Sequence, residues 1–183
     1  MNADNLSTDS NLPIMTDNLW NVLVPDDEYE KNKELYQTHI LEQYKIYVEM
    51  ADRVSARRNL ANVFFLTLHT TVLTAIGFAF QKIELVSPRW LTLFPMTGIL
   101  TMCLVWWWLI QSYRQLNTAK YTVVGLLEKR LPSSPYWSAE WKELGEGKDL
   151  NKYLPLTSLE RIIPILFGVI YILIEIYILC FMP

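Results

Sequence analysis

Three long apolar stretches constrain this chain more than any other feature of its sequence. They are residues 60–80, 91–110 and 162–181, each about 20 residues long. A helix of that length reaches across the roughly 30 Å hydrocarbon core of a bilayer. Because lipid offers the backbone no hydrogen-bond partners, each stretch must be helical. The sequence therefore predicts an all-α membrane protein with three transmembrane helices.

The third stretch contains a carboxyl group, Glu175, which leaves a second interpretation open. In that interpretation two helices cross the membrane and the third lies at its surface. An apolar run of 18 or more residues is seldom the core helix of a water-soluble protein, however. Three crossings are therefore the prediction.

The positions of lysine and arginine predict the orientation. Lys82 and Arg89 lie between the first two stretches, and the other basic residues precede residue 60 or lie within residues 111–161. The positive-inside rule then puts both large polar regions in the cytoplasm and the C-terminus outside. The arginines nearest to the predicted membrane edge are candidate contacts for anionic lipid headgroups, although a topology signal without further use is the simpler interpretation. They are Arg53, Arg57, Arg58, Arg114 and Arg161.

The polar regions are predicted to form a helical hairpin. Residues 1–25 are acidic and read as a mobile tail, available to a cytoplasmic protein partner. Residues 26–59 predict a cytoplasmic helix that runs into the first span, residues 81–90 an outer hinge, and residues 111–131 a helix that continues the second span. Residues 132–161, rich in Pro, Ser, Gly and Trp, predict an irregular cytoplasmic segment.

The two cytoplasmic helices have matching surfaces. The apolar face of the first recurs at helical spacing and consists of Tyr36, Ile40, Tyr44, Tyr47, Ala51 and Val54. Along the second helix, Arg114, Lys120 and Lys129 are available to the acids of the first, which are Glu42, Glu49 and Asp52. We expect the apolar faces to pack and these charges to pair across the hairpin.

The sequence offers no arrangement of residues for catalysis. His39 and His69 are far apart in the chain and have no thiol or carboxylate at metal-ligand spacing. The segment 145–148 lacks the spacing and the hydroxyl residue of a phosphate-binding loop. We therefore expect no catalytic residue, no metal and no cofactor, and the net charge of −3 argues against nucleic acid as a partner.

Polar residues inside the spans are the stronger functional signal, because a carboxylate near mid-bilayer costs about 2.5 to 3.5 kcal/mol. Helical rise places Glu175 at nearly the depth of Thr74 and Thr97, with His69 and Thr101 in a second layer about 6 Å further in. In one interpretation these residues line a cation or proton path through an oligomer. In the other, Glu175 is a protonated acid that is hydrogen-bonded to a threonine between helices.

Several separated motifs point to a known family. The first group is Glu42-Gln43-Tyr44-Lys45, Met50-Ala51-Asp52-Arg53, Ser55-Ala56-Arg57-Arg58 and Phe64-Phe65-Leu66-Thr67-Leu68. The second is Ser112-Tyr113-Arg114-Gln115-Leu116-Asn117-Thr118-Ala119-Lys120, Glu128-Lys129-Arg130-Leu131-Pro132 and Tyr136. Together they resemble the RipA family of small octameric bacterial inner-membrane proteins over roughly residues 35–167.

The resemblance implies a closed ring of eight subunits in the bacterial inner membrane. With the orientation predicted from charge, the N-terminus would then be cytoplasmic and the C-terminus periplasmic. It implies no established reaction and supplies no catalytic residue. A weaker, architectural resemblance is to the two-span effector domains of bacterial defence systems, which are thought to form pores; the third span of this chain departs from that pattern.

Two functions follow as alternatives. The first is a non-enzymatic scaffold or membrane-organising homo-oligomer that presents its cytoplasmic surface to partners. The residues themselves support an oligomer, because three thin spans with aromatic stripes leave much surface to bury between subunits. The second is an ion or proton channel with Glu175 lining the path. Membrane-embedded catalysis has no residues to support it.

Overall fold

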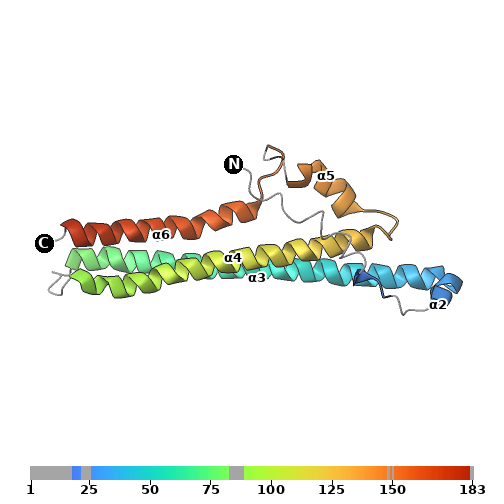
Figure 1. The fold of residues 1–183 in the computed structure, drawn as a ribbon, viewed down its shortest axis with the longest axis horizontal. Helices are drawn as coiled ribbons and strands as arrows, with labels where there is room; N and C mark the ends of the chain where they lie inside the picture. Colours follow the sequence, from blue (N-terminus) through green and yellow to red (C-terminus); the bar gives the residue numbers. More distant parts are fainter. Residues whose placement is uncertain (1–17, 22–25, 83–88, 148, 150, 182–183) are drawn as a thin grey trace. The chain divides into compact units, whose positions relative to one another are not determined.

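The computed structural model describes residues 18–21, 26–82, 89–147, 149 and 151–181, and these residues contain helices and no strand. The elements follow the order α2 (Asp26–Lys31), α3 (Lys33–Lys82), η1 (Arg89–Thr92), α4 (Leu93–Glu128), η2 (Pro135–Glu140), α5 (Trp141–Glu143), η3 (Gly145–Gly147) and α6 (Leu156–Phe181) (Figure 1). The all-α prediction is confirmed, and α3, α4 and α6 are long and apolar enough to cross a membrane. Most of the predicted tail and of the outer hinge lies outside the described residues.

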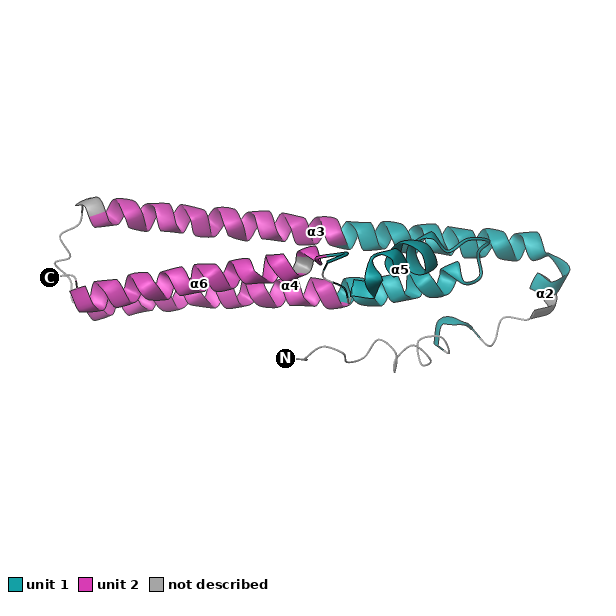
Figure 2. Cartoon of the chain, turned by 90° about the horizontal axis from the view of Figure 1, so that it is seen from above, with its two compact units in different colours: residues 1–54, 116–153 teal, residues 55–115, 154–183 magenta. Residues whose placement is uncertain are grey.

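The chain folds into two compact units (Figure 2). Unit 1 comprises residues 1–54 and 116–153, and unit 2 comprises residues 55–115 and 154–183. Helices α3 and α4 each contribute one part to each unit. All three predicted membrane-spanning stretches fall within unit 2.

In unit 1, the first part of α3 packs against the last part of α4. The predicted face of the first helix is the buried one, since Ile40, Ala51 and Val54 are all less than a tenth exposed. Val124 and Leu127 of α4 are likewise buried. Apolar burial at helical spacing therefore joins the two helices as predicted.

The predicted ion pairs across the hairpin do not form at Glu42 and Glu49. Glu42 forms an ion pair with Lys45 at 2.8 Å, and Glu49 forms one with Arg53 at 2.7 Å, both within α3. A partner one turn along the same helix is within easy reach of a glutamate side chain. Lys120 instead places its ammonium group 5.5 Å from the ring centre of Tyr47.

The first cytoplasmic helix is interrupted at Asn32. The sequence predicts one continuous helix from residue 26, whereas α2 (Asp26–Lys31) begins there and ends at Lys31, and α3 begins at Lys33. Between them, the Asn32 side chain accepts a hydrogen bond from the backbone N–H of Leu35 at 3.0 Å. Asn32 therefore acts as the N-cap of α3, a role for which asparagine is well suited.

The segment after α4 is more ordered than its composition suggests. It begins with η2, a single π-helical turn whose first backbone groups are capped by the Ser134 side chain, which accepts from the N–H of Ser138 at 3.2 Å. It ends with η3, where Gly145, Glu146 and Gly147 all have positive φ. Two of these three residues are glycines, for which this conformation carries no steric cost.

Unit 2 is a bundle of the remaining parts of α3 and α4 with α6. Its core contains Met96, Cys103 and Tyr171, with apolar side chains from α3 packed around them, among them Leu73 and Ile76. Many other apolar side chains of this unit are exposed in the single protomer, as expected of a surface that meets lipid or other subunits.

A close approach in unit 1 generates the first prediction. A methyl group added at Gly125 of α4 would lie 2.6 Å from Cε3 of Trp137 in η2. Although alanine normally stabilises a helix by about 1 kcal/mol relative to glycine, Gly125→Ala should destabilise unit 1 by about 1 to 3 kcal/mol through overpacking. Thermal unfolding of the detergent-solubilised protein measures this.

The matched control is Gly98→Ala, since nothing lies within 4 Å of a methyl group at that position. It should be neutral or stabilising. Equal melting temperatures for Gly125→Ala and Gly98→Ala would contradict the close packing of Trp137 on α4.

Candidate functional site

Glu175 of α6 is buried within unit 2, with 6% of its surface exposed. Its Oε1 lies 2.7 Å from the hydroxyl of Thr92 in η1. Its Oε2 is also buried and has no hydrogen-bond partner among the described residues. Glu175 is one of the residues that line a partly open pocket of about 190 Å³ with mainly apolar walls. Glu175 is thus joined to a threonine from another element, one that the sequence analysis did not select.

The three threonines that the sequence analysis did select are occupied within their own helices. Thr74 donates to the carbonyl of Thr70, Thr97 to that of Leu93, and Thr101 to that of Thr97, at 2.7 to 2.8 Å. All three are exposed in the protomer. A threonine in a helix readily donates to the carbonyl four residues earlier, so none of these hydroxyls is turned toward Glu175.

His69 of α3 is buried in a hydrogen-bonded chain that one neutral tautomer satisfies. Its Nδ1 lies 3.1 Å from the hydroxyl of Tyr171, which in turn donates to the His69 carbonyl at 3.1 Å. The Tyr171 proton is therefore used, and Nδ1–H must be the donor to the tyrosine oxygen. Nε2 is then an acceptor for the thiol of Cys103 at 3.8 Å.

Aromatic rings enclose the same histidine. The ring centres of Phe65, Trp106 and Phe167 lie 6.5, 5.6 and 5.3 Å from that of His69. Trp106 also donates its indole N–H to the Asn62 side chain at 3.0 Å. His69 is therefore a satisfied residue of the core of unit 2, and the structure does not bring it together with Thr101 or Glu175.

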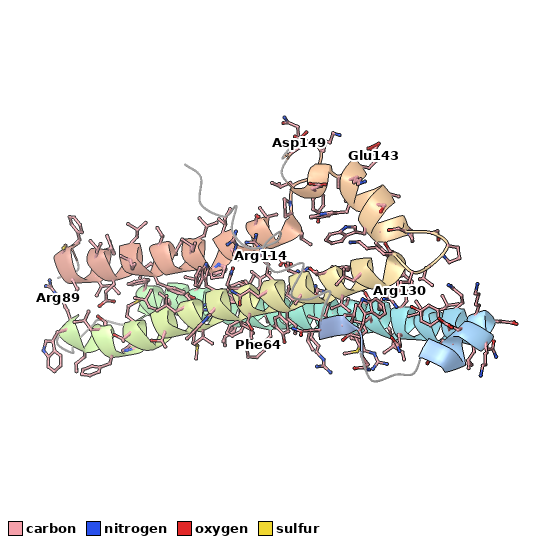
Figure 3. All side chains as sticks on the ribbon, turned by 45° about the vertical axis from the view of Figure 1, so that its right-hand side comes forward. Phe64, Arg89, Arg114, Arg130, Glu143 and Asp149 are labelled. Carbon is pink, nitrogen blue, oxygen red and sulfur yellow. The ribbon has the colours of Figure 1, made fainter. Side chains whose placement is uncertain are left out.

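The five arginines differ in how they are held. Arg53 pairs with Glu49 and Arg57 is exposed, whereas Arg58 places Nε 3.4 Å from Oε2 of Glu160. Arg161 donates to Gln111 at 3.5 Å. Arg114 is partly buried on α4 and is labelled in Figure 3. Contact with lipid headgroups stays a prediction for this set.

A buried carboxylate in unit 1 escaped the sequence analysis. Glu128 at the end of α4 is 1% exposed. Its Oε1 accepts from the Tyr44 hydroxyl and the Tyr136 N–H, both at 3.1 Å. Its Oε2 accepts from the Ser134 hydroxyl at 2.7 Å and the Trp137 N–H at 2.9 Å. One side chain thus joins α3, α4 and η2.

The electrostatics of this cluster agree with its geometry. Burial raises the pKa of Tyr44 to about 12, and the hydrogen bond to Glu128 adds to the rise. A neutral tyrosine donor is therefore maintained beside the carboxylate. The sequence does contain a signal for this burial, because Glu128 continues the apolar spacing of α4 directly before the turn at 129–134. An acidic residue at the end of a helix is usually exposed to solvent, however, so the sequence analysis did not select it.

One described residue of the predicted tail contacts the end of the α4 hairpin within unit 1. The ring centre of Trp20 lies 3.3 Å from the guanidinium carbon of Arg130, which also contacts Tyr36. Arg130 is labelled in Figure 3. Trp20 lies within the predicted tail, residues 1–25, most of which is outside the described residues. Stacking of an arginine on tryptophan is a favourable cation–π contact.

The described residues contain no group of three or more His, Cys, Asp or Glu side chains placed to hold a metal ion. Buried polar side chains in both units form hydrogen bonds between elements, among them Glu128 in unit 1 and His69 with Tyr171 in unit 2. These groups therefore join helices.

The comparisons with known proteins identify a family. Residues 41–180 match the model of the octameric membrane protein family (8xMP). This agrees with the resemblance to octameric membrane proteins drawn from the motifs, although the name RipA is not part of the description of that family. No curated protein and no solved structure matches the chain significantly.

The Glu128 cluster generates the second prediction. Glu128→Gln replaces two accepting lone pairs with N–H groups that face other donors, and should cost about 3 kcal/mol in the docking of η2. A loss of that size raises the equilibrium constant for undocking of η2 from α4 roughly a hundredfold. Trypsin cleavage after the exposed Lys142 should become faster by a similar factor, as measured by gel electrophoresis or mass spectrometry over time.

The control is Glu140→Gln, an identical change at an exposed position of η2. It should leave the cleavage rate within about twofold of the unmodified protein. If both variants were cleaved at the same rate, Glu128 would not hold η2 on α4.

Proposed function

The chain belongs to the octameric membrane protein family, and from this premise we propose that it is a non-enzymatic homo-octamer acting as a scaffold or membrane-organising assembly in the bacterial inner membrane. Unit 1, which includes the predicted tail, lies in the cytoplasm and presents a binding surface to a protein partner. The C-terminus lies in the periplasm. The bilayer and the other subunits are its remaining partners.

The surface of α3 in unit 2 is the observation that carries this proposal. One face of the helix packs on the protomer core through His69, Leu73 and Ile76. The opposite face, containing Phe64, Thr67, Thr71, Thr74 and Phe78, is exposed. Figure 3 labels Phe64 on the side away from α6. Of the residues in the most apolar segment of this span, about 6% are buried in the protomer, compared with 22% in the corresponding segments of α4 and α6.

Small and hydroxylated residues on an uncovered helix face favour contact with another helix over contact with lipid. The hydroxyls of Thr71 and Thr74 donate to carbonyls of α3 itself, at 2.8 Å each. These side chains therefore need no polar partner and leave a narrow surface on which a second helix can pack closely. We assign this face to the contact between neighbouring subunits, and the more apolar α6 to the lipid.

The orientation rests on charge. Arg57 and Arg58 precede the first span, Arg114 follows the second and Arg161 precedes the third, so all lie at one edge of the predicted membrane region of unit 2. The positive-inside rule assigns that edge to the cytoplasm. Exposed arginines there, Arg57 in particular, suit the anionic headgroups of the inner leaflet.

A scaffold suits the intramembrane polar groups better than a conduit does. His69 is enclosed by aromatic rings, and the selected threonines donate within their own helices. A water-filled path needs polar groups turned toward it. In the described part of the chain, His69 instead joins α3 to α6, and the threonine hydroxyls are engaged within their own helices.

The third prediction tests the subunit contact. Thr71→Phe places a ring on the proposed interface and should shift the purified protein from octamer to smaller species, measured by native mass spectrometry or light scattering in detergent. Ile172→Phe is the control, because Ile172 is exposed on α6 and should face lipid. An intact octamer with Thr71→Phe, or loss of the octamer with Ile172→Phe alone, would reverse the assignment of faces.

One observation favours a second function, an ion or proton channel with Glu175 on the path. Glu175 lines a pocket between the membrane-spanning helices, and its buried Oε2 has no partner among the described residues. The fourth prediction therefore concerns cation and proton flux into liposomes that contain the octamer. For a scaffold, we expect no flux above that of protein-free liposomes. Flux that is lost in Glu175→Gln would instead establish a conduit and overturn the scaffold proposal.

A further inference from the structure

Two adjoining pockets open between the helices of unit 2, in the half nearest the hinge. Their volumes are about 190 and 270 Å³, and both are lined by Phe80 of α3 and Ile174 of α6. The remaining walls of the second pocket are Ile170, Leu173 and Tyr177 of α6. We call the two together the hinge pockets. Their walls are mainly apolar, so they suit hydrocarbon.

The hinge pockets have the dimensions of lipid chains. From Ile170 to Tyr177, helical rise gives a length of about 10 Å, which is most of the roughly 15 Å of hydrocarbon in one leaflet. Each pocket is larger than the cavity of about 150 Å³ that accommodates benzene. Leu173 and Tyr177 are also more than half exposed in the protomer. The pockets are therefore open along the face of α6 that the proposed function assigns to lipid.

A guanidinium group lies at the hinge end of these pockets. Arg89 donates from Nη1 to the carbonyl of Leu179 at 3.4 Å, and Leu179 directly follows Ile178, a lining residue of the first pocket. Figure 3 labels Arg89 at the C-terminal end of α6. A guanidinium has five N–H donors, and this hydrogen bond uses one of them. Among the described residues, no carboxylate forms an ion pair with Arg89.

The surroundings of Arg89 favour a negative charge at the membrane edge. The chain between the first two spans contains two basic residues, Lys82 and Arg89, and one acid, Glu84. The positive end of the α4 helix dipole lies at the same edge and adds to the attraction, because Arg89–Glu128 forms one span of 40 residues. Trp90 is 57% exposed beside Arg89, as is common for tryptophan at the level of lipid headgroups.

A cation beside apolar pockets that open toward lipid matches the two parts of an anionic phospholipid. We propose that this end of unit 2 is a binding site for such a lipid, whose headgroup phosphate accepts hydrogen bonds from Arg89 and whose acyl chains lie in the hinge pockets. Arginine is well suited to phosphate, because its donors form a planar fork. A zwitterionic phospholipid has the same chains but no net charge for Arg89 to attract.

The test uses two photoreactive lipids with identical diazirine-labelled acyl chains, a phosphatidylglycerol and a phosphatidylcholine. Each is added in trace amounts to nanodiscs of phosphatidylcholine that contain the intact protein, and cross-linked residues are identified by mass spectrometry. We expect labelling at Phe80 and Tyr177, one from each helix beside the second pocket, with about fivefold higher yield for phosphatidylglycerol. Equal yields from the two lipids would overturn the proposal.

Two pairs of variants separate the charge from the pockets. Arg89→Gln should bring the two yields within about twofold of each other, whereas Lys142→Gln, an exposed charge removed from unit 1, should leave the preference unchanged. Ile174→Phe places a ring at the wall that both pockets share and should lower both yields about threefold or more. Ile172→Phe, outside both pockets on the same helix, should not lower them. A preference for phosphatidylglycerol that survives Arg89→Gln would exclude Arg89 as the headgroup contact.

This inference rests on the proposed assignment of α6 to lipid, but the two can fail separately. An intact octamer that both lipids label equally retains the proposed scaffold and lacks the lipid site. If neither lipid labels Phe80 or Tyr177, and Ile172→Phe disrupts the octamer, a second subunit covers the hinge pockets and both assignments are wrong.

Discussion

Lipid supplies no hydrogen bonds, and the polar side chains in the membrane-spanning part of unit 2 are arranged around that constraint. Threonines such as Thr74 donate within their own helices. Trp106 donates to Asn62, and His69 is satisfied by Tyr171 and Cys103. The bonds of Trp106 and His69 join different helices and fix which of their faces meet. Glu175 follows the same rule with Oε1, which lies 2.7 Å from the Thr92 hydroxyl, while its buried Oε2 has no partner among the described residues.

Unit 1 meets the same requirement with a charge. The Glu128 carboxylate is buried, and four donors from α3 and the segment after α4 surround it. Removing one partner of such a group costs more than an ordinary hydrogen bond contributes, because the remaining charge stays buried. The nearby contact of Trp137 with Gly125 belongs to the same packing. A segment with little helix propensity is thereby held on α4 by a few residues.

The sequence predicted the features that depend on composition and period. Three helices long and apolar enough to cross a membrane, the all-α class and the buried face through Ile40, Ala51 and Val54 all follow from apolar residues at helical spacing, and the structure confirms them. The hydrogen-bond partners of individual side chains could not be predicted from this spacing. Thr92 lies in a short 3₁₀ turn whose geometry helical rise does not describe, so depth counting paired Glu175 with Thr74 and Thr97 instead. Glu128 was missed because burial of an acid depends on a fold of residues 134–137 that no local pattern encodes.

The division of unit 1 between two distant stretches has a consequence for biosynthesis. Its halves, residues 1–54 and 116–153, are separated in the chain by the first two spans. Tyr44 leaves the ribosome long before Glu128, the acceptor of its hydroxyl. The hairpin can therefore close only after α3 and α4 have both been delivered to the membrane. Until then, the apolar face through Ile40, Ala51 and Val54 has no residues of α4 to pack against.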